Sequence, residues 1–365
     1  MTIDLTRRSF LGSVAAGAAL AVPAGLVLPG RPAHAAGERL VVVQWGAGWI
    51  EVSKKLIEPF QKETGDQIAW ELHAGGAMAI VAKIRPQWPR VPYNVVSAWN
   101  PVFSAMDAEG WLDTITVDEV PNLKDIPDSF VQKNAKGQAI SVPLSTAGAF
   151  WGYRTDLLDK PLENLDQLLE PRFKGKICVP FPVNLSGLLL VTLAIQRGGN
   201  ERNVEPGWEF LKELAKRGNI GRVINNNSEF INAMSGGDLS VAFFNNGGWS
   251  SVRKQFPVKI TNKLPGNKGF LYNEGFCILK GEKTAASKKL ANYFAGAAQN
   301  QEYNWNLGSG PTNSKSKVNP DVADFYYPPD ELAQYAYFAD FAYLSTQVDA
   351  WAKRWETEIV PLLRG

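Results

Sequence analysis

Six aromatic side chains and one carboxylate stand beside the ends of segments that we expect to form strands. The aromatic residues are Trp45, Trp49, Trp99, Trp151, Trp249 and Tyr272, and the carboxylate is Glu274. Aromatic faces stack on flat ligands and attract ammonium groups, with about 0.5–2 kcal/mol for each contact. Core packing is the alternative for any single tryptophan, and a hinge salt bridge is the alternative for Glu274. As a set, these residues predict a site for a cationic or zwitterionic ligand.

Two polar motifs favour an anionic group at the same site. The segment Asn184-Leu-Ser-Gly187 precedes an apolar helix, and we expect Ser186 to cap that helix. The segment from Asn245 to Gly248 repeats the arrangement before Trp249. Backbone N–H groups at such helix starts can bind a carboxylate or phosphonate, although simple N-capping is the alternative. A zwitterion such as an amino acid derivative or betaine would satisfy both these amides and Glu274.

Catalytic and metal-binding patterns are missing from the sequence. There is no Gly-x-Ser-x-Gly motif, and His73 is the only histidine outside the first 35 residues. The Gly-rich stretch from Trp45 to Trp49 lacks the third glycine of a dinucleotide fingerprint. Cys178 and Cys277 stand in apolar runs, which predicts two buried free thiols in preference to a disulfide. We therefore expect no catalytic residues, no metal site and no cofactor.

The first 35 residues have the order of a twin-arginine signal peptide. Arg7 and Arg8 precede an apolar run from Leu11 to about Pro29, and the small residues around His34 offer a cleavage point. Glycines and prolines within the run argue against the alternative, a membrane anchor. We therefore predict a periplasmic protein without this segment.

The charge balance of the chain argues against two classes of partner, and its length indicates more than one lobe. Removing residues 1–35 takes away three arginines and one aspartate, so the 38 basic and 36 acidic residues of the chain become equal in number. Proteins that bind nucleic acid or anionic membranes usually have a basic excess on one face, so we expect neither partner. The remaining chain also exceeds the ~250–300 residues that a single hydrophobic core usually serves, which predicts two lobes.

Strand-like and helix-like segments alternate along the chain, which is typical of α/β proteins with parallel sheets. The strand-like segments are 40–43, 67–72, 94–98, 176–179, 239–244 and 274–279, and the helix-like segments are 52–60, 78–84, 103–110, 186–196, 206–217, 230–235 and 284–298. The uncharged segment 143–153 lies between the two series, and the segment 272–278, which contains Glu274, follows the second series. Residues 331–363 are expected to be largely helical.

Five short motifs carry a resemblance to a known family. The chain resembles the bacterial extracellular solute-binding proteins of ABC transporters, in the branch that contains the spermidine/putrescine and ferric-iron binding proteins. The motifs are Leu40-Val-Val-Val-Gln-Trp45, Glu58-Pro-Phe-Gln-Lys-Glu-Thr-Gly65, Tyr93-Asn-Val-Val96, Glu109-Gly-Trp111 and Phe173-Lys-Gly-Lys176.

The resemblance implies a type II periplasmic-binding-protein fold, in which two doubly wound α/β lobes are joined by two crossing strands. Lobe 1 would comprise residues 36–147 and 275–330, lobe 2 residues 148–274, and C-terminal helices residues 331–365. It also implies a monomer that holds a small-molecule solute in the cleft and passes it to an ABC permease in the inner membrane.

Carried over residue by residue, the polyamine-binding pattern fits only in part. Trp45, Trp99, Tyr272 and Glu274 match it, but the acidic residue expected in lobe 2 is replaced by Phe181–Ser186, which contains no carboxylate. Asp340 or another C-terminal acid would have to serve the far end of a diamine. A polyamine-like amine or a zwitterion is favoured. The alternatives are ferric iron, for which the adjacent Tyr326 and Tyr327 lie beyond the expected position, a carboxylate or phosphonate, and an exported enzyme.

Replacing Arg7 and Arg8 together by lysine should leave the protein in the cytoplasm, because the export pathway recognises the arginine pair as an address. Cell fractionation and immunoblotting of the double variant check this. Normal appearance of the double variant in the periplasm would contradict the signal assignment.

Overall fold

The computed structural model describes residues 37–73 and 78–363. The predicted signal peptide lies outside the described residues, so the export route stays a prediction. Within the described ranges, no helix has both the length and the apolarity that a membrane crossing requires.

The strands form one continuous mixed sheet. Its central order is β2 (Gln67–Leu72), β1 (Arg39–Gln44), β3 (Val95–Trp99), β9 (Gly269–Ile278), β4 (Val142–Arg154), β7 (Val241–Asn245), β5 (Ile177–Pro180) and β6 (Ile220–Ile224). Strands β2, β1 and β3 are parallel to one another, as are β7, β5 and β6. The three short strands β8 (Val258–Ile260), β10 (Gly310–Pro311) and β11 (Ala336–Phe338) pair with β4 or β9. Each parallel set belongs to one lobe.

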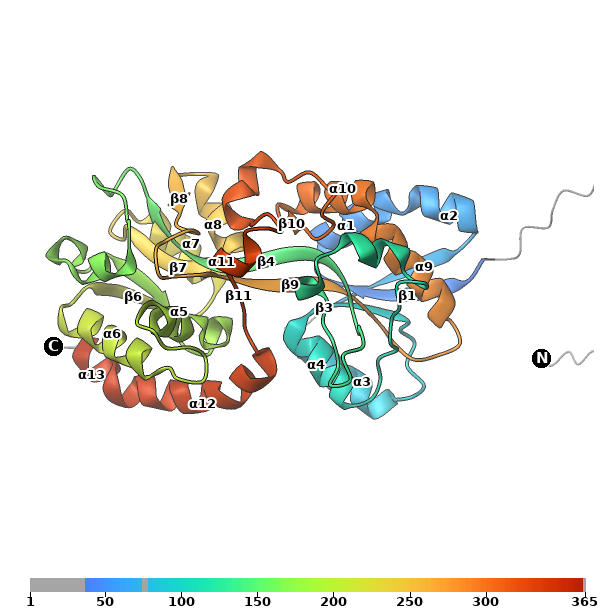
Figure 1. Cartoon of the computed structure of the whole chain (residues 1–365), viewed down its shortest axis with the longest axis horizontal. Helices are drawn as coiled ribbons and strands as arrows, with labels where there is room; N and C mark the ends of the chain where they lie inside the picture. The colour runs from blue at the N-terminus through green and yellow to red at the C-terminus, as the bar shows by residue number, and fades with distance from the viewer. Residues whose placement is uncertain (1–36, 74–77, 364–365) are drawn as a thin grey trace, which may run out of the picture. The chain divides into compact units, whose positions relative to one another are not determined.

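Strands β4 and β9 cross between the two lobes (Figure 1). They pair antiparallel from Val142 opposite Phe276 to Ala149 opposite Phe270. From Ala149 onward β4 pairs with β7, whereas β9 pairs with β3 from Glu274 onward. The predicted fold, two α/β lobes joined by two crossing strands, is therefore confirmed. The exact lobe boundaries remain predictions, because both crossing strands belong to both lobes.

Helices cover the faces of this sheet. They are α1 (Ala47–Leu56), α2 (Glu58–Thr64), α3 (Ala79–Ile84), α4 (Asn100–Ala108), α5 (Leu188–Gln196), α6 (Glu205–Lys216), α7 (Asn227–Ser235), α8 (Asn246–Arg253), α9 (Thr284–Ala295), α10 (Ala297–Leu307), α11 (Leu332–Tyr335), α12 (Phe341–Glu358) and α13 (Val360–Leu363). The C-terminal region is largely helical as predicted, although β11 interrupts it.

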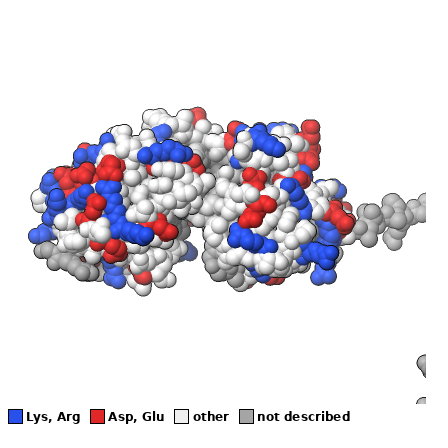
Figure 2. Space-filling view, turned by 90° about the horizontal axis from the view of Figure 1, so that it is seen from below, with Lys and Arg blue, Asp and Glu red and all other residues white. Residues whose placement is uncertain are grey.

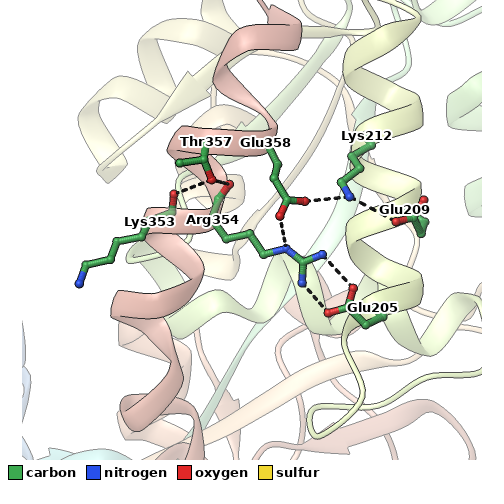
Figure 3. Close-up of polar contacts among 7 residues, drawn as sticks. All are labelled: Glu205, Glu209, Lys212, Lys353, Arg354, Thr357 and Glu358. Carbon is green, nitrogen blue, oxygen red and sulfur yellow. Dashed lines mark hydrogen bonds and ion pairs between the residues drawn. The ribbon is translucent and has the colours of Figure 1, made fainter.

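The long helix α12 packs against lobe 2. Trp351 and Trp355 on its inner face are buried in the same apolar cluster as Leu188 of α5. Toward α6, Arg354 pairs with Glu205 and with Glu358, and Glu358 also forms an ion pair with Lys212 at 2.8 Å (Figure 3). Exposed ion pairs contribute only about 0–1 kcal/mol each, so the buried tryptophans dominate this docking.

Positive and negative side chains are interspersed on the face that Figure 2 shows, and no field of one sign dominates it. This face is hollowed between the two lobes, and mostly uncharged residues border the hollow.

A buried asparagine joins α10 to the crossing strand β4. Asn300 donates to the Leu144 carbonyl at 2.7 Å and accepts hydrogen bonds from the N–H groups of Thr312 and Asn313 at 2.9 and 3.0 Å. Asn304 donates to the same carbonyl at 2.8 Å. Removal of a side chain that bonds several buried backbone groups lowers stability, because each buried group left without a partner costs about 1–3 kcal/mol of folding free energy.

Asn300→Ala should therefore lower the free energy of unfolding by about 2–5 kcal/mol, since two buried N–H groups lose their acceptor. Chemical denaturation measures the change. Asn306→Ala on the same helix is the matched control, because Asn306 is exposed and bonds only to Glu302, and it should change stability by less than about 1 kcal/mol. Equal effects of the two substitutions would contradict the role given to Asn300.

Candidate ligand-binding site

A cavity of about 370 Å³ lies where the two lobes meet. It is lined by Trp45, Gly46, Trp49, Trp99, Leu185, Leu188, Tyr272 and Glu274. Trp45 and Gly46 follow β1, Trp99 ends β3, and Tyr272 and Glu274 lie on β9. Open α/β sheets place their binding sites at these carboxyl ends of parallel strands. Leu185 lies in the short turn Asn184–Gly187 before α5, and Leu188 is the first residue of α5 in the other lobe, so the cavity has walls from both lobes.

The aromatic rings of the cavity are held in place by further rings. Trp99 makes edge contacts with Tyr272 and with Phe341 of α12, both at 5.3 Å between ring centroids. Trp45 stacks on His73 at 4.0 Å and 24°. Burial holds the pKa of His73 below its usual value, so the imidazole against Trp45 is neutral near pH 7. Rings fixed in this way lose little freedom when a ligand arrives.

Glu274 is the charged group of the cavity. It lies on β9 opposite Trp99 of β3 and is partly buried. Burial raises the pKa of Glu274 to about 7, and no neighbouring charge or hydrogen bond among the described residues offsets that effect. Burial, and next to it the charge of Glu274, also raise the pKa values of Tyr272 and Tyr303. The carboxylate is thus set in an aromatic environment without a cationic partner among the described side chains.

Five of the residues that the sequence analysis predicts for the site line this cavity together, namely Trp45, Trp49, Trp99, Tyr272 and Glu274. Trp151 and Trp249 do not. Trp151 packs on Phe243 in the core of lobe 2, and Trp249 is fully buried with its indole N–H donating to the Phe150 carbonyl at 3.3 Å. Both are core residues, because β4 and α8 direct these side chains into the lobe instead of the cavity.

The helix cap predicted for Ser186 is corrected, and the polar residues predicted to bind an anion lie outside the cavity lining. The N-cap of α5 is Gly187, so Ser186 does not cap that helix, and neither Asn184 nor Ser186 lines the cavity. Leu185, which lies between them, does. Asn245 caps α8 by accepting the Gly248 N–H at 2.8 Å, and it too lies outside the lining. Asn245 is therefore confirmed as a helix cap, and its contact with a ligand remains a prediction.

Other sequence expectations can be placed in the fold. Cys178 and Cys277 are free and buried as predicted. Tyr327 is buried and donates its hydroxyl to the Asn262 carbonyl at 2.6 Å, so it is a core residue and not part of the cavity. No group of three or more His, Cys, Asp or Glu side chains suited to a metal ion occurs within residues 37–73 and 78–363.

Gly46, Leu185 and Leu188 were not among the predicted site residues. The glycines around Gly46 did suggest a close backbone approach to a ligand, which was the available signal. The two leucines carry no chemical signal in a sequence, because apolar residues at a helix start are as common in cores as in cavities.

Residues 55–353 match the profile of a family described as bacterial extracellular solute-binding protein. The chain belongs to this family. Three solved structures have the same fold. An ABC transporter protein from Clostridium perfringens is 19% identical with a TM-score of 0.72, and the match covers 88% of this chain and 99% of that chain. The spermidine/putrescine substrate-binding protein PotD from Streptococcus pneumoniae is 16% identical with a TM-score of 0.71 (87% of this chain and 100% of that chain covered), and iron-bound HitA from Pseudomonas aeruginosa is 17% identical with a TM-score of 0.64 (87% and 99% covered). No curated protein matches the chain. The family and these structures are binding proteins and not enzymes.

Glu274→Gln should stabilise the ligand-free protein at pH 8 by roughly 1–3 kcal/mol. Burial raises the pKa of Glu274 from 4.5 to about 7, so the folded state disfavours the ionised carboxylate. The destabilisation caused by the Glu274 carboxylate is therefore absent below about pH 4.5, grows as the pH rises from 4.5 to about 7, and is complete above about pH 7. Urea unfolding at pH 5 and pH 8 measures it.

Glu63→Gln on α2 is the matched control, because Glu63 is exposed and its substitution should leave stability unchanged at both pH values. A Glu274→Gln protein that is less stable than the parent at pH 8 would show that the carboxylate has a favourable partner.

Proposed function

We propose that this protein is the periplasmic substrate-binding component of an ABC importer. It captures a small organic amine or a zwitterion in the cavity between its lobes and delivers it to a permease in the inner membrane. The observation that carries the proposal is the uncompensated carboxylate of Glu274 inside an aromatic cavity.

An ammonium group would supply the cationic partner that the Glu274 carboxylate lacks. A desolvated carboxylate without a partner is costly, and a bound cation removes that cost by pairing with it. The faces of Trp45, Trp49 and Trp99 add cation–π attraction, which strengthens when water is excluded. Because a proton competes with the ligand for Glu274, affinity for an amine should fall as the pH drops below about 7.

The two lobes explain how a bound ligand is enclosed. The crossing strands β4 and β9 connect them, so rotation there would bring Leu185 and Leu188 toward the aromatic wall, as in hinge closure around ligands. Closure excludes water from the ion pair and changes the outer surface, which gives a permease two states to distinguish. PotD, a structural neighbour, is a spermidine/putrescine substrate-binding protein, which supports an amine for this chain.

A thermal-shift screen of residues 36–365 at pH 8 tests the proposal, because a ligand that binds only the native state raises Tm. The panel comprises amines, amino acids and betaines, carboxylates, phosphonates and ferric iron. An amine or zwitterion should stabilise the protein. Glu274→Gln should weaken its binding by about 2–5 kcal/mol, and Trp45→Ala should weaken it through lost cation–π contact.

Glu63→Gln and Trp305→Ala are the controls, since Glu63 and Trp305 are exposed and outside the cavity. Stabilisation by carboxylates, phosphonates or iron alone would overturn the proposed ligand class, and so would an amine whose affinity is unchanged in Glu274→Gln.

A further inference from the structure

The two walls of the cavity differ in their chemistry. Glu274 is the one charged side chain among the described residues that line it. The wall from lobe 2 consists of Leu185 and Leu188. A ligand in this cavity therefore meets a carboxylate and aromatic rings on one side and aliphatic carbon on the other.

Two acids near the cavity residue Trp99, Asp340 and Glu201, already have partners. Asp340 precedes Phe341, which packs on Trp99. Its carboxylate pairs with Arg202 at 2.7 Å and caps α12 by accepting the Tyr343 N–H at 3.0 Å. Glu201 accepts the Asp340 N–H at 3.0 Å. Asp340 thus does not supply the second carboxylate that a diamine would need, because moving it would break a helix cap and an ion pair.

We infer that the ligand is a monocation, with one ammonium group at Glu274 and an apolar body against Leu185 and Leu188; this rests on the proposed function. A second ammonium group would be desolvated against the leucines without an acceptor, and the carboxylate of a zwitterion would be desolvated there without a donor. Either group makes binding weaker. The cavity therefore favours a monoamine, and a diamine or an amino acid should bind more weakly because of the apolar wall.

Three ligands with the same four-carbon length test this assignment directly. n-Butylamine, 1,4-diaminobutane and 4-aminobutanoate share one ammonium end and differ only in a methyl, ammonium or carboxylate at the other. In isothermal titration at pH 8 with residues 36–365, n-butylamine should bind most tightly. The other two should bind at least about tenfold more weakly, which corresponds to about 1.4 kcal/mol.

A change of the facing wall should reverse the preference. Leu185→Asp adds a carboxylate there, and Leu185→Asn is the neutral control of the same shape. Leu185 has φ of 55°, a conformation that Asp and Asn adopt more readily than leucine. The Asp variant should bind 1,4-diaminobutane more tightly than n-butylamine, whereas the Asn variant should not. Should the Asp variant fail to fold, the unmodified protein still decides the question.

The outcomes separate this inference from the proposed function. If 1,4-diaminobutane or 4-aminobutanoate binds the unmodified protein as tightly as n-butylamine, and Glu274→Gln abolishes that binding, the monocation inference is overturned and the proposed function stands. If none of the three binds while ferric iron or a dicarboxylate does, both are overturned.

Discussion

The pairing of β4 with β9 is the constraint on which the rest of the molecule depends. These strands belong to both lobes. β9 pairs with β3 in lobe 1, β4 pairs with β7 in lobe 2, and in the stretch that joins the lobes β4 and β9 pair with each other. Their backbones approach closely: a Cβ added at Gly148 would lie 2.4 Å from the Phe270 carbonyl oxygen, and one at Gly275 would lie 2.2 Å from that of Val142. The pleat of β9 then places Tyr272 and Glu274 on one face, because residues two apart in a strand point the same way.

The two faces of β9 have different functions: one bonds to the neighbouring backbone, and the other lines the cavity. Asn273, between Tyr272 and Glu274, points to the opposite face, where its side chain donates to the Phe130 carbonyl at 2.8 Å and its N–H donates to Asn100. The backbone N–H and the side-chain NH2 group of Asn273 thus have acceptors, whereas the Glu274 carboxylate has no cationic or hydrogen-bonding partner among the described residues. The ligand-free protein therefore carries an electrostatic cost at one position of a strand that is otherwise well bonded, and ligand binding can relieve that cost without rearranging the sheet.

The sequence predicted the fold well, because hydrophobic periodicity and motif order report on elements of regular structure. It also placed Trp45 and Trp99 correctly at the ends of β1 and β3. Trp151 could not be placed, because all residues of β4 are buried and no polar alternation shows which face meets the cavity. The helix start at Ser186 failed for a local reason: Leu185 and Ser186 adopt φ of 55° and 51°, which is uncommon for residues other than glycine.

The short turn that carries Leu185 has a consequence for the order in which the protein becomes functional. Gly187 ends this turn with φ of 74°, and a Cβ there would lie 2.5 Å from the Trp351 ring of α12. The lobe 2 wall of the cavity is thus packed against α12, which follows every lining residue of the cavity in the chain. Because domains fold as units during and after synthesis, the nascent chain cannot complete this wall until its C-terminal helix has emerged from the ribosome. Binding competence therefore requires that α12 has been synthesised and has packed on lobe 2.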